Sequence, residues 1–129
     1  MQLRFLSALA MLTAAPTLAV GQDQPVIDGK LVFATTCAAC HSLMPPMTLA
    51  PPMVMVARHY REKFTSDSAG IGAIARFVID PDSSRSALPA HAIERFGLMP
   101  KQPTVSPAQA HAVARYVWNL SDTTATPEH

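Results

Sequence analysis

The stretch Cys37-Ala38-Ala39-Cys40-His41 carries the most specific chemical information in this chain of 129 residues. Two thiols three positions apart are followed directly by an imidazole. This C-x-x-C-H order is the pattern of covalent haem attachment, in which each thiol adds to one haem vinyl group. The spacing corresponds to about one helical turn, so both sulfurs face the same side. We therefore expect one covalently attached haem c, with Cys37 and Cys40 as thioether positions and His41 as an iron ligand.

Other uses of the two cysteines fit the sequence less well. A thiol–disulfide redox pair usually lies in a strand-rich βαβ setting, and no such pattern surrounds Cys37 and Cys40. A zinc site needs four ligands, whereas the chain has only two cysteines. A purely structural disulfide is disfavoured because the two residues are so close together within a helix.

The N-terminus has the pattern of an export signal. Met1 to Arg4 is short and positively charged, and residues 5–20 are almost purely apolar with small residues at their end. This pattern predicts a secretory signal peptide over residues 1–21. The apolar run is short for a membrane span, and an uncleaved membrane anchor is the alternative. Export to the periplasm agrees with haem attachment, which takes place on the outer side of the energy-transducing membrane.

The exported chain carries little net charge. Removal of the signal peptide takes away Arg4, one of ten basic residues, and leaves nine basic against nine acidic residues. Nucleic acid is therefore not expected as a partner, and no basic run indicates binding to anionic lipid. We expect a monomer that contacts a membrane only transiently or through an uncleaved anchor.

A helix over residues 29–39 is predicted to carry the haem-binding stretch. Gly29, Phe33 and Cys37 recur every four residues and share one face of it. This segment resembles the N-terminal helix of class I cytochromes c, in which a glycine and an aromatic precede C-x-x-C-H at these offsets. The resemblance implies that Gly29 and Phe33 pack across a C-terminal helix, which brings its own aromatic, here Tyr116. A simple helix-start glycine is the alternative role for Gly29.

Residues 42–52, here called the Met-rich loop, follow His41. Their two Pro-Pro pairs forbid a helix before Pro52. A ligating histidine usually donates its other ring N–H to an oxygen acceptor. In the cytochrome c family a carbonyl of this proline region accepts that hydrogen bond, and Pro51 or Pro52 is the matching residue. Thioethers also suit Cu(I), although methionine is a common filler of apolar gaps. The copper hypothesis concerns Met44, Met47, Met53 and Met55.

Hydrophobic periodicity predicts further helices over residues 52–64, 70–80 and 89–96. A last helix is expected to begin at Ser106, which forms a capping box with Gln109. The expected fold class is all-α and cytochrome c-like: four to five short helices wrapped around one haem, with the N- and C-terminal helices crossing. The domain would span residues 22–122, followed by a disordered tail over 123–129.

Gly97-Leu98-Met99-Pro100 matches the family's pattern for the second, distal iron ligand. The resemblance implies that Met99 approaches the iron from the side opposite His41. A role as a core methionine is the alternative. Other candidates for the distal ligand are Met53, Met55 and His91.

The sequence does not decide which residues would contact the haem propionates. Trp118 either packs on a loop or donates its N–H to a propionate. The charged residues of the second predicted helix, Arg61 among them, are expected to be solvated. Together the candidates for propionate contacts are Arg58, Arg76, Arg95, Tyr60 and Trp118.

The resemblance covers nearly the whole exported chain and implies an iron with both axial positions filled by protein. Such an iron has no open position for a substrate and suits outer-sphere electron transfer. No paired carboxylates, nucleophile–base set or phosphate loop indicates catalysis. We expect a non-enzymatic, periplasmic one-electron carrier that cycles between Fe(III) and Fe(II) and exchanges electrons with redox partner proteins.

Two alternative functions follow from the same motif. If the distal position is open or labile, the protein would be a gas-binding or peroxide-reducing haem protein. It could also be a haem c subunit docked on an exported oxidoreductase. An exposed apolar patch around the Met-rich loop would support docking.

Overall fold

The computed structural model of the protein describes residues 25–123. The predicted signal peptide over residues 1–21 lies outside this range, as does the predicted tail beyond residue 123. The described part consists of helices and loops without strands, which confirms the all-α fold class. The elements are α1 (Gly29–Val32), η1 (Phe33–Cys37), α2 (Met53–Lys63), α3 (Asp67–Ile79), η2 (Ser83–Arg85), α4 (Ala90–Phe96) and α5 (Pro107–Thr123).

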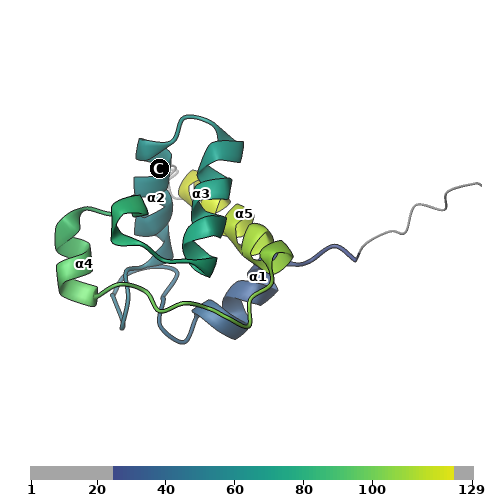
Figure 1. The fold of residues 1–129 in the computed structure, drawn as a ribbon, viewed down its shortest axis with the longest axis horizontal. Helices are drawn as coiled ribbons and strands as arrows, with labels where there is room; N and C mark the ends of the chain where they lie inside the picture. The colour runs from purple at the N-terminus through teal and green to yellow at the C-terminus, as the bar shows by residue number, and fades with distance from the viewer. Residues whose placement is uncertain (1–24, 124–129) are drawn as a thin grey trace, which may run out of the picture.

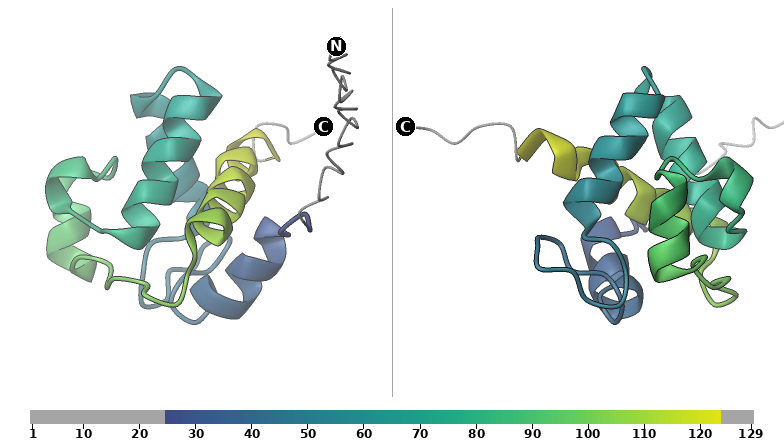
Figure 2. Two further views of the ribbon diagram at one scale, coloured as in Figure 1. Left: turned by 45° about the vertical axis from the view of Figure 1, so that its right-hand side comes forward. Right: turned by 90° about the vertical axis from the view of Figure 1, so that its left-hand side faces the viewer.

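The C-terminal helix α5 is the centre of the packing. It contacts α1, α2 and α3, and it lies between α3 and α1 in Figure 1 and in the left panel of Figure 2. The short helix α4 stands away from α5 at the opposite end of the molecule (Figure 1). The Met-rich loop and the connection from α4 to α5 both run along the lower side of the molecule, near α1, in Figure 1 and in the left panel of Figure 2. None of the helices within residues 25–123 combines the length and hydropathy that a membrane crossing requires.

The first helix changes its winding where a regular helix over residues 29–39 was expected. Asp28 caps its start, since the carboxylate accepts a hydrogen bond from the Lys30 N–H at 2.9 Å. After Val32 the backbone winds as a π-helix, with the Ala38 N–H donating to the Phe33 carbonyl at 3.0 Å. The helix therefore ends at Cys37, earlier than predicted. π-turns are rare and are found frequently at functional sites.

The predicted contact between the first and last helices is present. A Cβ built on Gly29 would collide with the carbonyl oxygen of Ala112 and lie 3.1 Å from Cβ of Tyr116. The ring centroids of Phe33 and Tyr116 are 5.8 Å apart, at an interplanar angle of 45°. Gly29 is thus a close-approach glycine, because only a residue without a side chain lets the two backbones meet here.

Helix α3 begins at Asp67, three residues before the predicted start at residue 70. The cause is Ser66, whose hydroxyl accepts a hydrogen bond from the Ala69 N–H at 3.3 Å and caps the helix. Gly70 therefore lies inside the helix, where an added Cβ would overlap the ring of Trp118. Gly70, which the sequence places at the boundary of a loop, is therefore a residue on which Trp118 packs.

Arg61 was predicted to be solvated, and this prediction was wrong. Its Nε donates to the Trp118 carbonyl at 2.9 Å, and its guanidinium lies 4.6 Å from the centroid of the indole ring. The indole N–H of Trp118 in turn donates to a carboxylate oxygen of Asp67 at 3.0 Å. These contacts join α2, α3 and α5, so Trp118 packs between helices and not on a loop, and its N–H donates to Asp67.

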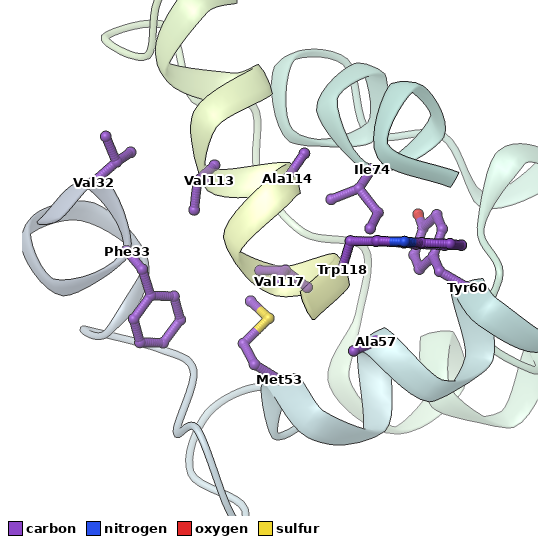
Figure 3. Packing of buried hydrophobic residues seen from close by; sticks show 10 residues of the cluster. All are labelled: Val32, Phe33, Met53, Ala57, Tyr60, Ile74, Val113, Ala114, Val117 and Trp118. Atoms are coloured by element: carbon purple, nitrogen blue, oxygen red, sulfur yellow. The ribbon is translucent and has the colours of Figure 1, made fainter. Parts of the chain in front are cut away.

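The core forms where α5 meets the other helices (Figure 3). Helix α5 contributes Val113, Ala114, Val117 and Trp118, which are at most 3% exposed. The side chain of Met53 extends from α2 toward Val117 in Figure 3. The predicted capping box at the start of α5 is confirmed by two reciprocal hydrogen bonds. Ser106 N–H donates to the Gln109 side chain at 2.9 Å, and Gln109 N–H donates to the Ser106 hydroxyl at 3.2 Å.

Candidate functional site

A cavity of about 210 Å³ opens between η1, the Met-rich loop, α2 and the chain around α4. Most of its lining is apolar side chains. Cys37, Cys40 and His41 of the one C-x-x-C-H stretch line it, and Met99, which is far from them in sequence, lines it too. The structure therefore brings together the four residues that the sequence assigns to haem. An apolar cavity with a few convergent polar or sulfur groups is the usual form of a cofactor site.

The His41 ring is oriented by one backbone carbonyl. Its Nδ1 lies 2.8 Å from the carbonyl oxygen of Pro51. Because a carbonyl only accepts hydrogen bonds, Nδ1 carries the proton and Nε2 keeps its lone pair. Pro52 does not play this part, since its carbonyl accepts the N–H groups of Met55 and Val56 at 3.0 and 3.2 Å. The ring is thus in the tautomer that a metal-binding imidazole needs.

Hydrogen bonds attach the second half of the Met-rich loop to the C-x-x-C-H turn and join its first residue to the start of α2. The Cys40 carbonyl accepts the Thr48 hydroxyl at 2.6 Å and the Ala50 N–H at 3.1 Å. The Ser42 carbonyl accepts the Met53 N–H at 2.8 Å. These bonds fix the Pro51 carbonyl relative to His41. Sequence reasoning missed Thr48, because nothing local distinguishes it from any other loop threonine.

Both thiols are free and belong to one turn. The N–H groups of Cys40 and His41 donate to the Cys37 carbonyl at 3.1 and 3.0 Å, which closes the turn after η1. Burial raises the pKa of the Cys37 thiol. Thiol–disulfide enzymes need the opposite, a cysteine whose pKa is lowered so that it is a thiolate at neutral pH. The environment of Cys37 therefore does not favour a dithiol redox site.

The candidates for the distal ligand differ in whether they line the cavity. Met99 is partly buried and lines the cavity from the connection between α4 and α5. Met53 lines the cavity too, but it is 8% exposed and belongs to the core cluster around α5. Met55 and His91 do not line the cavity, and His91 is exposed on α4. The geometry leaves Met99 and Met53 as residues that reach the site.

Few polar side chains border the cavity. Tyr60 is 2% exposed, and burial raises its pKa to about 12, against a smaller lowering by a hydrogen bond with the Ala87 backbone. The sequence did not single out Gln102, which also lines the cavity and donates to the Pro100 carbonyl at 3.0 Å. Of the residues considered for propionate contacts, Tyr60 lines the cavity. The others, which do not line it, are Arg58, Arg76, Arg95 and Trp118.

An apolar patch is exposed beside the cavity. Met44 and Leu49 of the Met-rich loop are 55% and 73% exposed. The other exposed residues of this patch are Leu43, Met47 and, on the segment after α4, Leu98. Met53 is buried in the core while Met44 is exposed, so the methionines of the copper hypothesis do not share one environment.

No group of three or more His, Cys, Asp and Glu side chains within residues 25–123 is arranged to hold a metal ion. A scan of the chain against protein-family models found no match, and neither did searches of curated proteins and of solved structures.

Proposed function

We propose that the protein is a monohaem c-type cytochrome that carries single electrons. The observation that supports this most strongly is the meeting of Cys37, Cys40, His41 and Met99 at one apolar cavity. The tautomer of His41, which leaves Nε2 available, is the second support. In this proposal Cys37 and Cys40 would hold the haem through thioethers to its vinyl groups, and His41 and Met99 would bind its iron.

Bound haem would supply one iron that exchanges a single electron between Fe(III) and Fe(II). The Pro51 carbonyl holds the His41 ring and increases its basicity as a ligand. The Met99 thioether would favour the ferrous state, and the apolar lining would disfavour the additional positive charge of the ferric state. Met99 and the apolar lining would therefore raise the reduction potential, whereas the more basic His41 ring would act in the opposite direction by stabilising the ferric state. With both axial positions occupied by protein, the site would transfer electrons without binding a substrate.

Optical spectra of the haem-loaded protein test this function. We expect low-spin spectra in both oxidation states and no change of the ferrous spectrum with carbon monoxide. Met99→Ala should open the distal position, give a high-spin ferric spectrum and bind carbon monoxide. Met53→Ala is the matched control, since it removes a second cavity-lining methionine and should leave the iron low-spin.

Two results would overturn this assignment. Carbon monoxide binding by the unmodified protein would mean an open or labile site and would favour a gas-binding or peroxide-reducing protein. A normal spectrum in Met99→Ala together with an altered one in Met53→Ala would transfer the distal role to Met53.

The exposed apolar patch supports a second candidate function, a haem c subunit docked on an exported oxidoreductase. Met44, Met47 and Leu49 are 55%, 41% and 73% exposed, and exposed apolar surface often marks an interaction site. Co-purification without crosslinking from the periplasm tests this function. A partner that remains bound to the unmodified protein and is lost in Leu49→Ser would support docking. A protein that always elutes as a free monomer would support the carrier.

Export to the periplasm is part of the proposal and depends on residues 1–21. N-terminal sequencing of the purified protein tests it. A chain that starts near residue 22 agrees with a cleaved signal peptide, whereas a chain that still starts at Met1 indicates an anchor or no export.

A further inference from the structure

A second cavity within residues 25–123, of about 420 Å³, lies outside the proposed haem site. It is bordered by the end of α2, one face of α3 and η2. Three of its lining residues are basic, namely Lys63, Arg76 and Arg85, and none is acidic. The remaining lining residues are Ser68 and side chains that are small or apolar. We call this space the basic cavity.

Two of the three cations have no carboxylate partner. Lys63 donates one hydrogen bond from its ammonium group to the Ser86 carbonyl at 2.8 Å, which leaves two N–H donors. The guanidinium of Arg76 makes no hydrogen bond or ion pair with the described residues. Both positive charges are therefore available to a bound anion.

Arg85 is held in place by carboxylates but keeps one buried donor free. Its Nη2 contacts a carboxylate oxygen of Asp80 at 2.8 Å, and its Nη1 lies 3.2 Å from a carboxylate oxygen of Asp82. Its Nε–H is buried and has no hydrogen-bond partner within the described chain. A buried donor without an acceptor is unfavourable, and such groups are rare in folded proteins. Because Nε is shielded from solvent, it is not offered to an anion in the open cavity, and Arg85 contributes its positive charge to the wall.

Acidic groups on the elements around this cavity are already engaged, Asp67 among them through the indole N–H of Trp118. Asp80 also receives the Lys101 ammonium at 2.7 Å, and this contact and Arg85 lower the pKa of its carboxyl. Glu62 is paired with Arg58 and His59 on the surface of α2. The basic cavity therefore keeps a positive excess although the whole chain is nearly neutral.

We propose that the basic cavity binds a phosphate-type oxyanion. Its donors are the Lys63 ammonium from α2 and the Arg76 guanidinium and Ser68 hydroxyl from α3, and Arg85 of η2 adds a positive charge to the wall. A tetrahedral anion presents oxygens in several directions and can accept from donors spread in this way, whereas chloride is a single atom. There is room for it, because nothing lies within 4 Å of a Cβ built on Gly72 in the cavity wall. This site does not depend on the electron-transfer proposal.

The test uses the full exported protein as purified, titrated with inorganic phosphate at constant ionic strength. Binding is followed by calorimetry and by the amide signals of Ser68 and Gly72. We expect saturable binding of phosphate and none of chloride. Arg76→Gln and Lys63→Gln should each weaken binding about tenfold, since each removes a charged hydrogen-bond donor.

Arg58→Gln is the matched control. It removes one positive charge from α2 at a residue that pairs with Glu62 and does not line the basic cavity, and it should leave phosphate affinity unchanged. Equal weakening in Arg58→Gln and Arg76→Gln would mean a diffuse charge effect and would overturn the proposal. Signal changes that grow with phosphate without saturating, or that equal concentrations of chloride reproduce, would overturn it as well.

A second arm identifies the source of the phosphate group. Vesicles of phosphatidylcholine with phosphatidic acid are sedimented with the protein, with and without inorganic phosphate. Sedimentation that inorganic phosphate reverses supports the site with a lipid headgroup as ligand. Saturable phosphate binding without sedimentation supports the site with a soluble phosphate as ligand.

Discussion

Replacement of Gly29 by alanine would place a methyl group against the backbone of α5. The obstacles are the carbonyl oxygen of Ala112, its carbonyl carbon at 2.6 Å and Cβ of Tyr116 at 3.1 Å. Two of these atoms belong to a helix backbone, so no change of rotamer can remove the collision. The start of α1 must therefore move away from α5, which also loosens the packing of Phe33 on Tyr116.

The expected change in the free energy of unfolding is the cost of overpacking minus the gain in helix propensity. Overpacking of this kind costs about 1–3 kcal/mol, and we take about 3 kcal/mol because backbone blocks the space. Alanine in a helix is about 1 kcal/mol more favourable than glycine. Gly29→Ala should therefore lower the free energy of unfolding by about 2 kcal/mol.

Gly72→Ala is the matched control for this prediction. Gly72 lies within α3 and a Cβ added there would have nothing within 4 Å, so only the propensity effect applies. This variant should be more stable than the unmodified protein by about 1 kcal/mol. The same chemical change is thus predicted to have opposite signs at Gly29 and Gly72.

Urea denaturation of the haem-loaded proteins, followed by circular dichroism at 222 nm, measures both changes. For an m-value of about 1–3 kcal/mol per molar urea, the midpoint of Gly29→Ala should fall by about 1 M. The reasoning is refuted if Gly29→Ala is as stable as the unmodified protein, or is stabilised to the same extent as Gly72→Ala. Either result would mean that α1 and α5 are not in close backbone contact.

Three further predictions concern pH and capping. The pKa of Tyr60 is raised to about 12 in the folded state against about 10 in the unfolded state, so its contribution to stability is complete below pH 10 and decreases above it. Between pH 9 and pH 11 urea unfolding should lose about 1.4 kcal/mol that Tyr60→Phe does not lose, and an equal loss in both would contradict this. The pKa of Asp80 is lowered, first by Lys101 and then by Arg85, so its contribution is present above about pH 4 and is lost as the pH falls further. Asp80→Asn should therefore be less stable than the unmodified protein at pH 7, and the difference should shrink in acid, which acid titration of the two proteins measures. Ser106→Ala removes one half of the capping box and should cost about 1 kcal/mol in thermal unfolding, whereas Ser83→Ala, outside any long helix, is the control.

The parts of the fold that sequence predicts well are those set by local spacing. Asp28, Ser106 and Gln109 cap helices through bonds within three residues along the chain, so the pattern of residue types is enough to find them. The Met-rich loop is irregular because of its two Pro-Pro pairs, and this too is a local feature of the sequence. The pairing of Gly29 with α5 was predictable only through the resemblance to cytochromes c, because it joins residues that are far apart in sequence.

The parts that sequence missed depend on tertiary contacts. Arg61 looks solvated by helical periodicity, yet the Trp118 ring and carbonyl come from another helix and cover it. The π-helical turn before Cys37 has no marker in the sequence. The basic cavity is formed by Lys63, Arg76 and Arg85, which belong to three different elements, so no motif contains it.

The candidate site could be predicted from the sequence in part. C-x-x-C-H identifies its chemistry from five consecutive residues, and the pattern around Met99 indicates where a second ligand would come from. Which proline carbonyl meets His41 could not be decided from the sequence. Pro51 and Pro52 differ only in that the start of α2 uses the carbonyl of Pro52.

The mass of the exported protein under denaturing conditions tests the central proposal most directly. The account predicts the mass of the chain without its signal peptide plus one haem, retained when the fold and the axial ligands are lost, because the thioethers of Cys37 and Cys40 are covalent. The bare polypeptide mass, with two free thiols or with a disulfide between them, would contradict the account. The two cysteines would then be a thiol–disulfide pair or a structural disulfide.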